Sequence, residues 1–260
     1  MYKIFSTHPW LRSFPVEKQV WVAKEAGFDG IDHIATMHEL LRSKENISKL
    51  SKKYGMPVLG IHSPLPLVAV TPVVLFSKLF RYISFFPECK VYNFHLSGFM
   101  HPLFNWKGNT LKRFMNLAKD KKIAISFESN PVLPIRVASR FYPKVTYHPE
   151  LFATYCVQNN LPITFDTSHI ADQGHDIVQF YRSYHKTIHL IHLSDYKTNA
   201  QHLPLGEGTL PLEALFKEMK RTRYRGTVSF EIYTFPNKTS IEEKLSMLKQ
   251  NLKFFKKYIS

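Results

Sequence analysis

In the stretch ITFDTSH, residues 163–169, a short and largely apolar run ends on a carboxylate, Asp166, and this pattern indicates how the chain folds. The same pattern recurs elsewhere in the chain, each time ending on a histidine or a glutamate. Its copies are VLGIHSP ending at His62, VYNFHLSG at His95, IAISFESN at Glu128, IHLIHLSD at His192 and TVSFEIY at Glu231. Short runs that are almost continuously apolar are typical of parallel strands buried on both faces.

The spacing of these residues predicts a barrel. Neighbouring members of the series lie 26 to 39 residues apart, which is about the length of one strand–helix unit. We therefore expect an α/β protein of one domain, residues 1–260, with eight such units closed into a (β/α)₈ TIM barrel. A doubly wound open sheet is the alternative, but no G-x-G-x-x-G motif follows the first expected strand.

Apolar runs and longer segments with helical periodicity alternate along the chain. The expected strands are Tyr2–Phe5, Phe28–His33, Val58–His62, Val91–His95, Ile123–Glu128, Ile163–Asp166, Ile188–His192 and Val228–Glu231. The expected helices are Val16–Ala26, His38–Tyr54, Val73–Phe85, Leu111–Lys119, Pro149–Gln158, Ile177–Tyr184, Leu212–Arg221 and Ile241–Tyr258. Gly27 after the first helix and Thr239 or Ser240 before the last are suitable caps.

A barrel brings the carboxyl ends of its strands into one ring, where enzymes of this architecture keep their sites. Six consecutive strands then point an imidazole or a carboxylate into the same mouth. Buried carboxylates repel one another unless a cation neutralises them, and a divalent metal accepts carboxylate oxygens together with imidazole nitrogens. The sequence therefore predicts a divalent metal (Mn, Zn, Co or Mg) on Glu128, Asp166, His192 and Glu231.

Further histidines lie near this ring. His62 and His95 end the third and fourth expected strands, where each could bind metal or orient a substrate. His169 and His202 follow strand ends by a few residues. His8 and His33 end the first two expected strands, where packing at the rim is the expected role.

The chain is basic, with 35 Lys and Arg against 20 Asp and Glu and a net charge of +15. A basic surface attracts anions, so phosphorylated small molecules, nucleic acid and acidic lipid are all candidate partners. The basic residues are spread along the whole sequence, however. A solvated, lysine-rich surface therefore explains the charge equally well.

The sequence predicts a reduced cytoplasmic protein without a transmembrane segment. Its start lacks the apolar stretch of a secretory signal, and Cys89 and Cys156 show no metal-type spacing. The most apolar region, Pro64–Phe86, is interrupted by prolines and basic residues and is a poor membrane span. Within it, Val73–Phe85 is more apolar than one buried helix stripe requires, so it forms either a tightly packed barrel helix or a surface for lipid or for homo-oligomer formation.

The strand-end motifs resemble the xylose-isomerase-like TIM barrel superfamily over nearly the whole chain. The most specific are FDTSH at residues 165–169, IHLSD at 191–195, HLPLGEG at 202–208 and SFE at 229–231. That superfamily contains sugar and sugar-phosphate isomerases and epimerases, inosose dehydratase-like enzymes, and the endonuclease IV family of apurinic-site nucleases.

The two main branches imply different metal sites. The resemblance to the isomerase and epimerase branch implies one metal set, Glu128, Asp166, His192 and Glu231, in which the two glutamates also exchange a substrate proton. The resemblance to the nuclease branch implies a three-zinc cluster with further ligands, His62, His95, His169 and His202. The third zinc of that pattern needs a carboxylate where this chain has Ala200, unless Asp195 substitutes.

We therefore expect a metal-dependent isomerase or epimerase of a sugar or sugar phosphate, acting through a metal-stabilised enediolate. The expected catalytic residues are Glu128, Glu231 and His169, and the expected substrate-binding residues are His62, His95, His202 and Lys197. An endonuclease IV-like apurinic-site DNA phosphodiesterase, favoured by the basic charge, is one alternative. A lyase or dehydratase on the same metal site and a barrel that only binds its ligand are the others.

Overall fold

The computed structural model describes residues 1–36, 38–39, 46–64, 81–96, 109–120, 124–129, 144–236 and 239–259. Most of the segment Val73–Phe85 lies outside these residues, and so does part of the expected helix His38–Tyr54. Among the helices that are described, none is long and apolar enough to cross a membrane.

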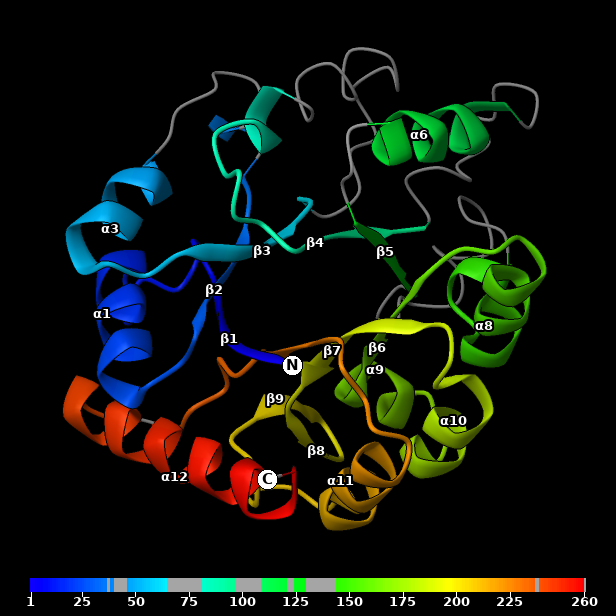
Figure 1. Cartoon of the computed structure of the whole chain (residues 1–260). Helices are drawn as coiled ribbons and strands as arrows, with labels where there is room; N and C mark the ends of the chain where they lie inside the picture. Colours follow the sequence, from blue (N-terminus) through cyan, green and yellow to red (C-terminus); the bar gives the residue numbers. More distant parts are fainter. Residues whose placement is uncertain are drawn as a thin grey trace.

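Eight parallel strands close into a barrel in the order β1-β10-β7-β6-β5-β4-β3-β2 (Figure 1). They are β1 (Tyr2–Thr7), β2 (Gly30–Ile34), β3 (Val58–His62), β4 (Val91–His95), β5 (Ile125–Glu128), β6 (Ile163–Asp166), β7 (Ile188–Leu193) and β10 (Thr227–Phe230). Each coincides with an expected strand to within a few residues, and the predicted (β/α)₈ barrel is confirmed.

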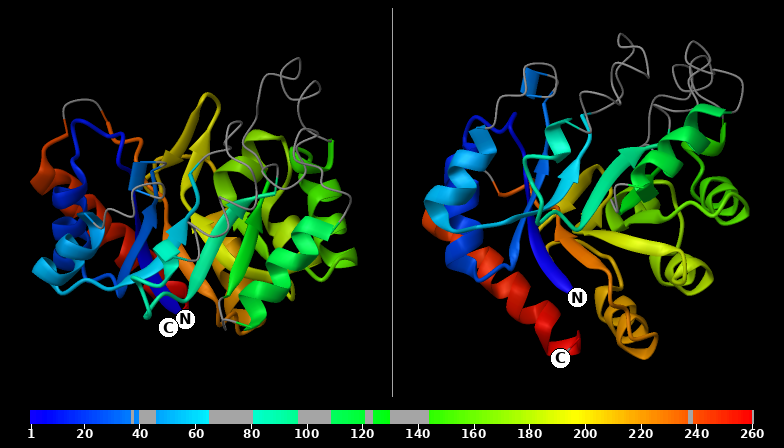
Figure 2. Two further views of the ribbon diagram at one scale, coloured as in Figure 1. Left: turned by 90° about the horizontal axis from the view of Figure 1, so that it is seen from above. Right: turned by 45° about the horizontal axis from the view of Figure 1, so that its top comes forward.

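Helices form a ring outside the strands (Figures 1 and 2). They are α1 (Val16–Ala26), α3 (Asn46–Tyr54), α6 (Asn109–Asp120), the 3₁₀ turn η2 (Lys144–Thr146), α8 (Pro149–Gln158), α9 (Thr167–Asp172), α10 (Ile177–Tyr184), α11 (Leu212–Arg221) and α12 (Ile241–Ile259). In α11 the buried residues Leu212, Leu215, Phe216 and Met219 recur at helical spacing, so one stripe faces the strands. Helix α12 packs against both α1 and α11 and so joins the two ends of the ring.

Strand residues alternate between two environments, because successive side chains point to opposite faces of a strand. One set is aromatic and packs outward on the helices: Phe165 stacks on Phe180, and Phe230 meets Phe255 edge-on. The other set points into the barrel and is polar. Thr164, next to Phe165, donates to the side chain of Asn93 at 2.7 Å across the interior. The outward apolar layer stabilises the barrel by packing against the helices, and the inward-facing positions carry polar side chains.

Two elements at the carboxyl ends of the strands were not expected from the sequence. Helix α9 begins directly after β6. An antiparallel hairpin, β8 (Asp195–Lys197) and β9 (Ala200–Leu203), follows β7. Figure 2 shows the hairpin, in yellow, standing up from the end of the barrel opposite the two chain termini. Both elements surround the mouth with short segments of regular secondary structure.

The buried carboxylate of Asp195 organises the chain after the hairpin. Its Oδ1 accepts from the backbone N–H groups of Tyr196 at 2.8 Å and Leu210 at 3.1 Å. Its Oδ2 accepts from Gly206 at 2.9 Å and Gly208 at 3.1 Å. A Cβ on Gly208 would overlap this carboxylate, which explains a glycine there. Both oxygens are thus engaged by backbone, and Asp195 supplies no free oxygen to a metal.

Replacing Asp195 with alanine is expected to lower the free energy of unfolding by about 2–3 kcal/mol, because it leaves several partly buried N–H groups without an acceptor. Asp195→Asn keeps one carbonyl oxygen and should lose less. Urea unfolding of the metal-free proteins measures both changes. A variant of unchanged stability that has lost bound metal would instead identify Asp195 as a ligand.

Candidate metal centre

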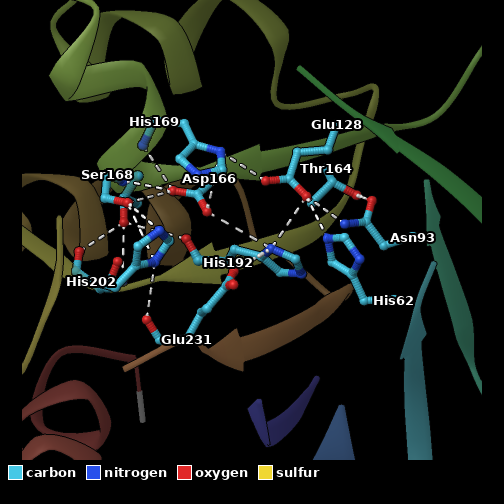
Figure 3. A network of polar contacts seen from close by, with 12 residues as sticks. His62, Asn93, Glu128, Thr164, Asp166, Ser168, His169, His192, His202 and Glu231 are labelled. Carbon is cyan, nitrogen blue, oxygen red and sulfur yellow. Dashed lines mark hydrogen bonds and ion pairs between the residues drawn. The ribbon is translucent and has the colours of Figure 1, made fainter. Parts of the chain in front are cut away.

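The inward-facing residues at the strand ends meet in one buried cluster (Figure 3). Glu128 ends β5, Asp166 ends β6, His192 lies in β7 and Glu231 follows β10. His62, at the end of β3, reaches the same cluster. Because all these positions close parallel strands, the barrel alone brings together residues that are far apart in the sequence.

His192 is at the centre of the cluster. Its Nδ1 lies 2.7 Å from an oxygen of Glu231, 3.5 Å from one of Glu128 and 3.8 Å from one of Asp166. The ligand atoms of Asp166, His192 and Glu231 all lie within 4.8 Å of one another, and the same holds for His62, Glu128 and His192. One cation could therefore be shared by these side chains without a large rearrangement.

The chemistry of the donors fits a divalent metal. Asp166 Oδ2, Glu231 Oε2 and His192 Nδ1 are buried, and none of them makes a hydrogen bond of acceptable geometry with the part of the chain that the structure describes. Buried polar atoms are normally satisfied, and each one left unpaired costs about 1–3 kcal/mol. Carboxylate oxygens combined with imidazole nitrogen suit zinc, manganese and cobalt, and carboxylates alone suit magnesium.

The charges of the cluster are strongly coupled. Burial opposes ionisation of Glu128, but His192, His95 and His169 outweigh it and hold the pKa of Glu128 well below its ordinary value. Burial likewise opposes the positive charge on His169, yet Asp166 and Glu128 raise the pKa of His169 to about 9. Without metal, protonated imidazoles thus balance the carboxylates. Metal binding at such a site releases protons, because the ligands must be deprotonated.

The two oxygens of Asp166 have different tasks. Oδ1 caps helix α9 by accepting from the backbone N–H groups of Ser168 at 2.8 Å and His169 at 2.9 Å, and from the Ser168 hydroxyl at 3.0 Å. Oδ2 is left facing His192. The cap therefore holds the carboxylate in the orientation that a metal ligand needs.

Glu128 is held in a similar way. Its Oε2 accepts a hydrogen bond of 2.5 Å from the side chain of Asn93, which in turn accepts from Thr164. Its Oε1 lies 2.9 Å from Nδ1 of His169. Asn93 and Thr164 were not expected from the sequence. Each precedes a predicted site residue by two positions, so the strand period of two is the signal that finds them.

The remaining predicted histidines also reach the mouth. His169 and His202 face each other edge-on, and their ligand atoms lie with those of Asp166 within 4.8 Å of one another. His202 stacks on Tyr233 at 4.4 Å, and His8 contacts the same ring. His95 lies 5.1 Å from His62, ring centre to ring centre.

Lys197 is the exception among the predicted site residues. It lies in β8 of the hairpin with its side chain exposed, and the described residues include no ion pair between it and the cluster. The buried Asp32, whose Oδ2 lies 3.4 Å from Nε2 of His192, was missed, because it lies in the middle of its strand and not at its end.

This chain is similar in sequence to one protein family over its carboxyl-terminal part and to uncharacterised proteins over most of its length. A family described as the xylose isomerase-like TIM barrel matches residues 144–255. Uncharacterised proteins of Mycobacterium leprae and Mycobacterium tuberculosis are 23% and 22% identical to it, each match covering 91% of this chain and 90% of the relative.

Solved structures of the same architecture match nearly the whole chain. A 3-keto-D-glucoside 4-epimerase from E. coli superposes with a TM-score of 0.67 at 16% identity, covering 99% of both chains. A D-psicose 3-epimerase from Clostridium cellulolyticum H10 gives 0.70 at 12% identity over 100% of both chains. The chain thus shares its closed-barrel fold with these structures, and its residues 144–255 are similar in sequence to the xylose isomerase-like TIM barrel family.

Proposed function

We propose that this protein is a divalent-metal-dependent epimerase or isomerase of a small carbohydrate, a sugar or sugar phosphate. The observation that carries the proposal is the pair of buried glutamates, Glu128 and Glu231, on either side of His192. Their strands, β5 and β10, are separated in the barrel by β6 and β7, so the two carboxylates approach the centre from different sides. Sugar epimerases are among the structures of similar fold.

The residues that would hold the metal are Glu128, Asp166, His192 and Glu231. When bound, a divalent cation polarises a carbonyl and its neighbouring hydroxyl and so acidifies the carbon-bound proton between them. Glu128 and Glu231 then act as the proton carriers: one carboxylate removes that proton on one face of the substrate, and the other returns a proton on the opposite face. Return to the opposite face inverts the carbon.

His169 supports this transfer. Its Nδ1 lies 2.9 Å from Glu128, and Asp166 and Glu128 together raise its pKa to about 9. This imidazole is placed to donate to a substrate oxygen beside the reacting carbon and keeps the carboxylate of Glu128 oriented. His62, on the other side of Glu128 at 3.3 Å, is placed to hold a further hydroxyl.

An aromatic wall borders the mouth. Tyr233 lies between His8 and His202, and the ring of Trp10 follows at 5.1 Å from His8. Trp10 is 51% exposed although it is a large apolar residue. Such rings offer a flat surface to the C–H face of a sugar, which supports a small carbohydrate as substrate.

The first test is metal content. Glu231→Ala is expected to lower the metal retained after dialysis against a weak chelator, and the double change of Glu128 and Glu231 to alanine should abolish it, because the cation loses two of its anionic ligands. The matched control is Glu218→Ala, a glutamate paired with Arg182 and Arg221 away from the site. Full retention by the double variant, measured by mass spectrometry of the metal, would contradict the proposed ligands.

The second test is the number of metals. We expect one or two per chain, because Ala200 offers no ligand and the oxygens of Asp195 are engaged by backbone N–H groups. Anomalous scattering from crystals grown with excess metal counts the sites. Three fully occupied sites would favour the nuclease over the epimerase.

The third test is proton exchange. Metal-loaded protein, incubated in D₂O with a panel of ketoses, aldoses and their phosphates, is expected to place deuterium on one carbon of its substrate and to yield the isomer or epimer. Glu128→Gln and Glu231→Gln should each slow exchange by about 10²–10⁴-fold, whereas Glu218→Gln should not change it. Metal-dependent nicking of abasic DNA without any sugar exchange would overturn the proposal, and loss of water from the sugar would indicate a dehydratase.

A further inference from the structure

Asp32 is a buried carboxylate for which the fold alone gives no reason. It lies in the middle of β2 with 0% of its surface exposed. Neither carboxylate oxygen accepts a hydrogen bond of acceptable geometry from the residues that the structure describes. Among the described residues it forms an ion pair with His192, whose Nε2 lies 3.4 Å from Oδ2. Strands β2 and β7 are separated in the barrel by β1 and β10, so this contact crosses the interior.

A carboxylate in this position is costly to the fold. Removing its charge from water is strongly unfavourable unless hydrogen bonds or a partner charge compensate. It also adds negative charge to an interior that already holds Glu128, Asp166 and Glu231. Stability alone would favour an uncharged residue of similar size here, so the reason for the aspartate lies in what it does to His192.

The two nitrogens of His192 face different groups. Nδ1 is directed at the three carboxylates of the candidate metal centre. Within the part of the chain that the structure describes, the ion pair of Nε2 is with Asp32. A neutral imidazole binds a metal through one nitrogen only when the other carries its proton, and an acceptor beside that other nitrogen selects this form.

We propose that Asp32 is the positioning residue of the metal centre: its carboxylate accepts a hydrogen bond from Nε2–H of His192, fixes the tautomer and orientation of the ring, and leaves Nδ1 free to bind the metal. Asp32 touches His192 from the edge of the ring that faces away from the other ligands, so it acts through His192 and is not a ligand itself. The inference rests on the metal-binding part of the proposed function and not on the identity of the sugar.

The neighbouring strand leaves space for this carboxylate. Gly60 of β3 is paired with Asp32, and a Cβ at Gly60 would lie 2.6 Å from Oδ1 and 2.8 Å from Cγ of Asp32. It would also come within 2.9 Å of the side chain of Ile4. Any larger residue at position 60 would therefore push the carboxylate from its place under His192.

The experiment compares three full-length proteins: wild type, Asp32→Asn and Ser6→Ala. Ser6 is the matched control, because it is buried, has no hydrogen-bond partner for its hydroxyl among the described residues, and pairs with Asp32 in the register of β1 and β2. Three quantities are measured with Co²⁺ as the probe: its dissociation constant by chelator competition, its visible absorption spectrum, and the melting temperature of the metal-free protein.

We expect Asp32→Asn to bind Co²⁺ about 10–100-fold more weakly with an altered spectrum, while its metal-free form melts at the same or a higher temperature. The last result separates the two roles, because a merely structural aspartate would cost stability when replaced and would leave the Co²⁺ spectrum unchanged. Ser6→Ala should match the wild type in both Co²⁺ measurements.

Gly60→Ala is the second variant, since it displaces the carboxylate without removing it; it should also weaken Co²⁺ binding. Co²⁺ affinity within twofold of wild type and an unchanged spectrum in Asp32→Asn would overturn this inference alone. If Asp32→Asn does not fold, normal Co²⁺ binding by Gly60→Ala would overturn it. A wild-type protein that binds no Co²⁺ would overturn both this inference and the metal-dependent function.

Discussion

Carboxylates enclosed inside a closed barrel cannot rely on bulk water to weaken their mutual repulsion. Glu128, Asp166 and Glu231 meet in this interior, and Asp32 also reaches it. Among the described residues, the imidazoles of His169 and His192 lie against these carboxylates. The imidazoles and hydrogen bonds around the mouth offset the repulsion between these carboxylates. The aromatic residues that pack between the strands and the helices stabilise the fold and offset the free-energy cost of these buried charges.

The hydrogen bonds around the cluster limit how far it can relax. Asn93 holds one oxygen of Glu128, and the start of helix α9 holds one oxygen of Asp166. In Asp166 the second oxygen faces His192. In Glu128 the oxygen that Asn93 holds is itself the one that faces His192, and the second oxygen lies against His169. This preorganisation is what a catalytic metal site requires, since ligands that must move to bind lose affinity and precision.

The barrel could be predicted because its strands appear in the sequence as apolar runs and its helices as segments with helical periodicity. Both patterns can be recognised within a short stretch of sequence. The strand-end residues followed from the barrel, as the positions of Glu128, Asp166, His192 and Glu231 show. Helix α9 and the β8–β9 hairpin were not predicted, since α9 is only six residues long and the hairpin depends on backbone N–H groups that Asp195 collects from distant positions. Lys197 was expected at the site from the resemblance, and it is exposed in β8 of the hairpin.

One further consequence concerns Asp166, which serves the centre and helix α9 with the same carboxylate. The metal-facing oxygen and the capping oxygen cannot move independently, because both are bonded to the same carbon, Cγ, and the cap fixes one of them. Cations of different radius would draw Oδ2 in by different amounts and would tilt the first turn of α9 with it. His169 is in that turn, so the ionic radius of the metal and the place where a substrate hydroxyl is held are mechanically linked.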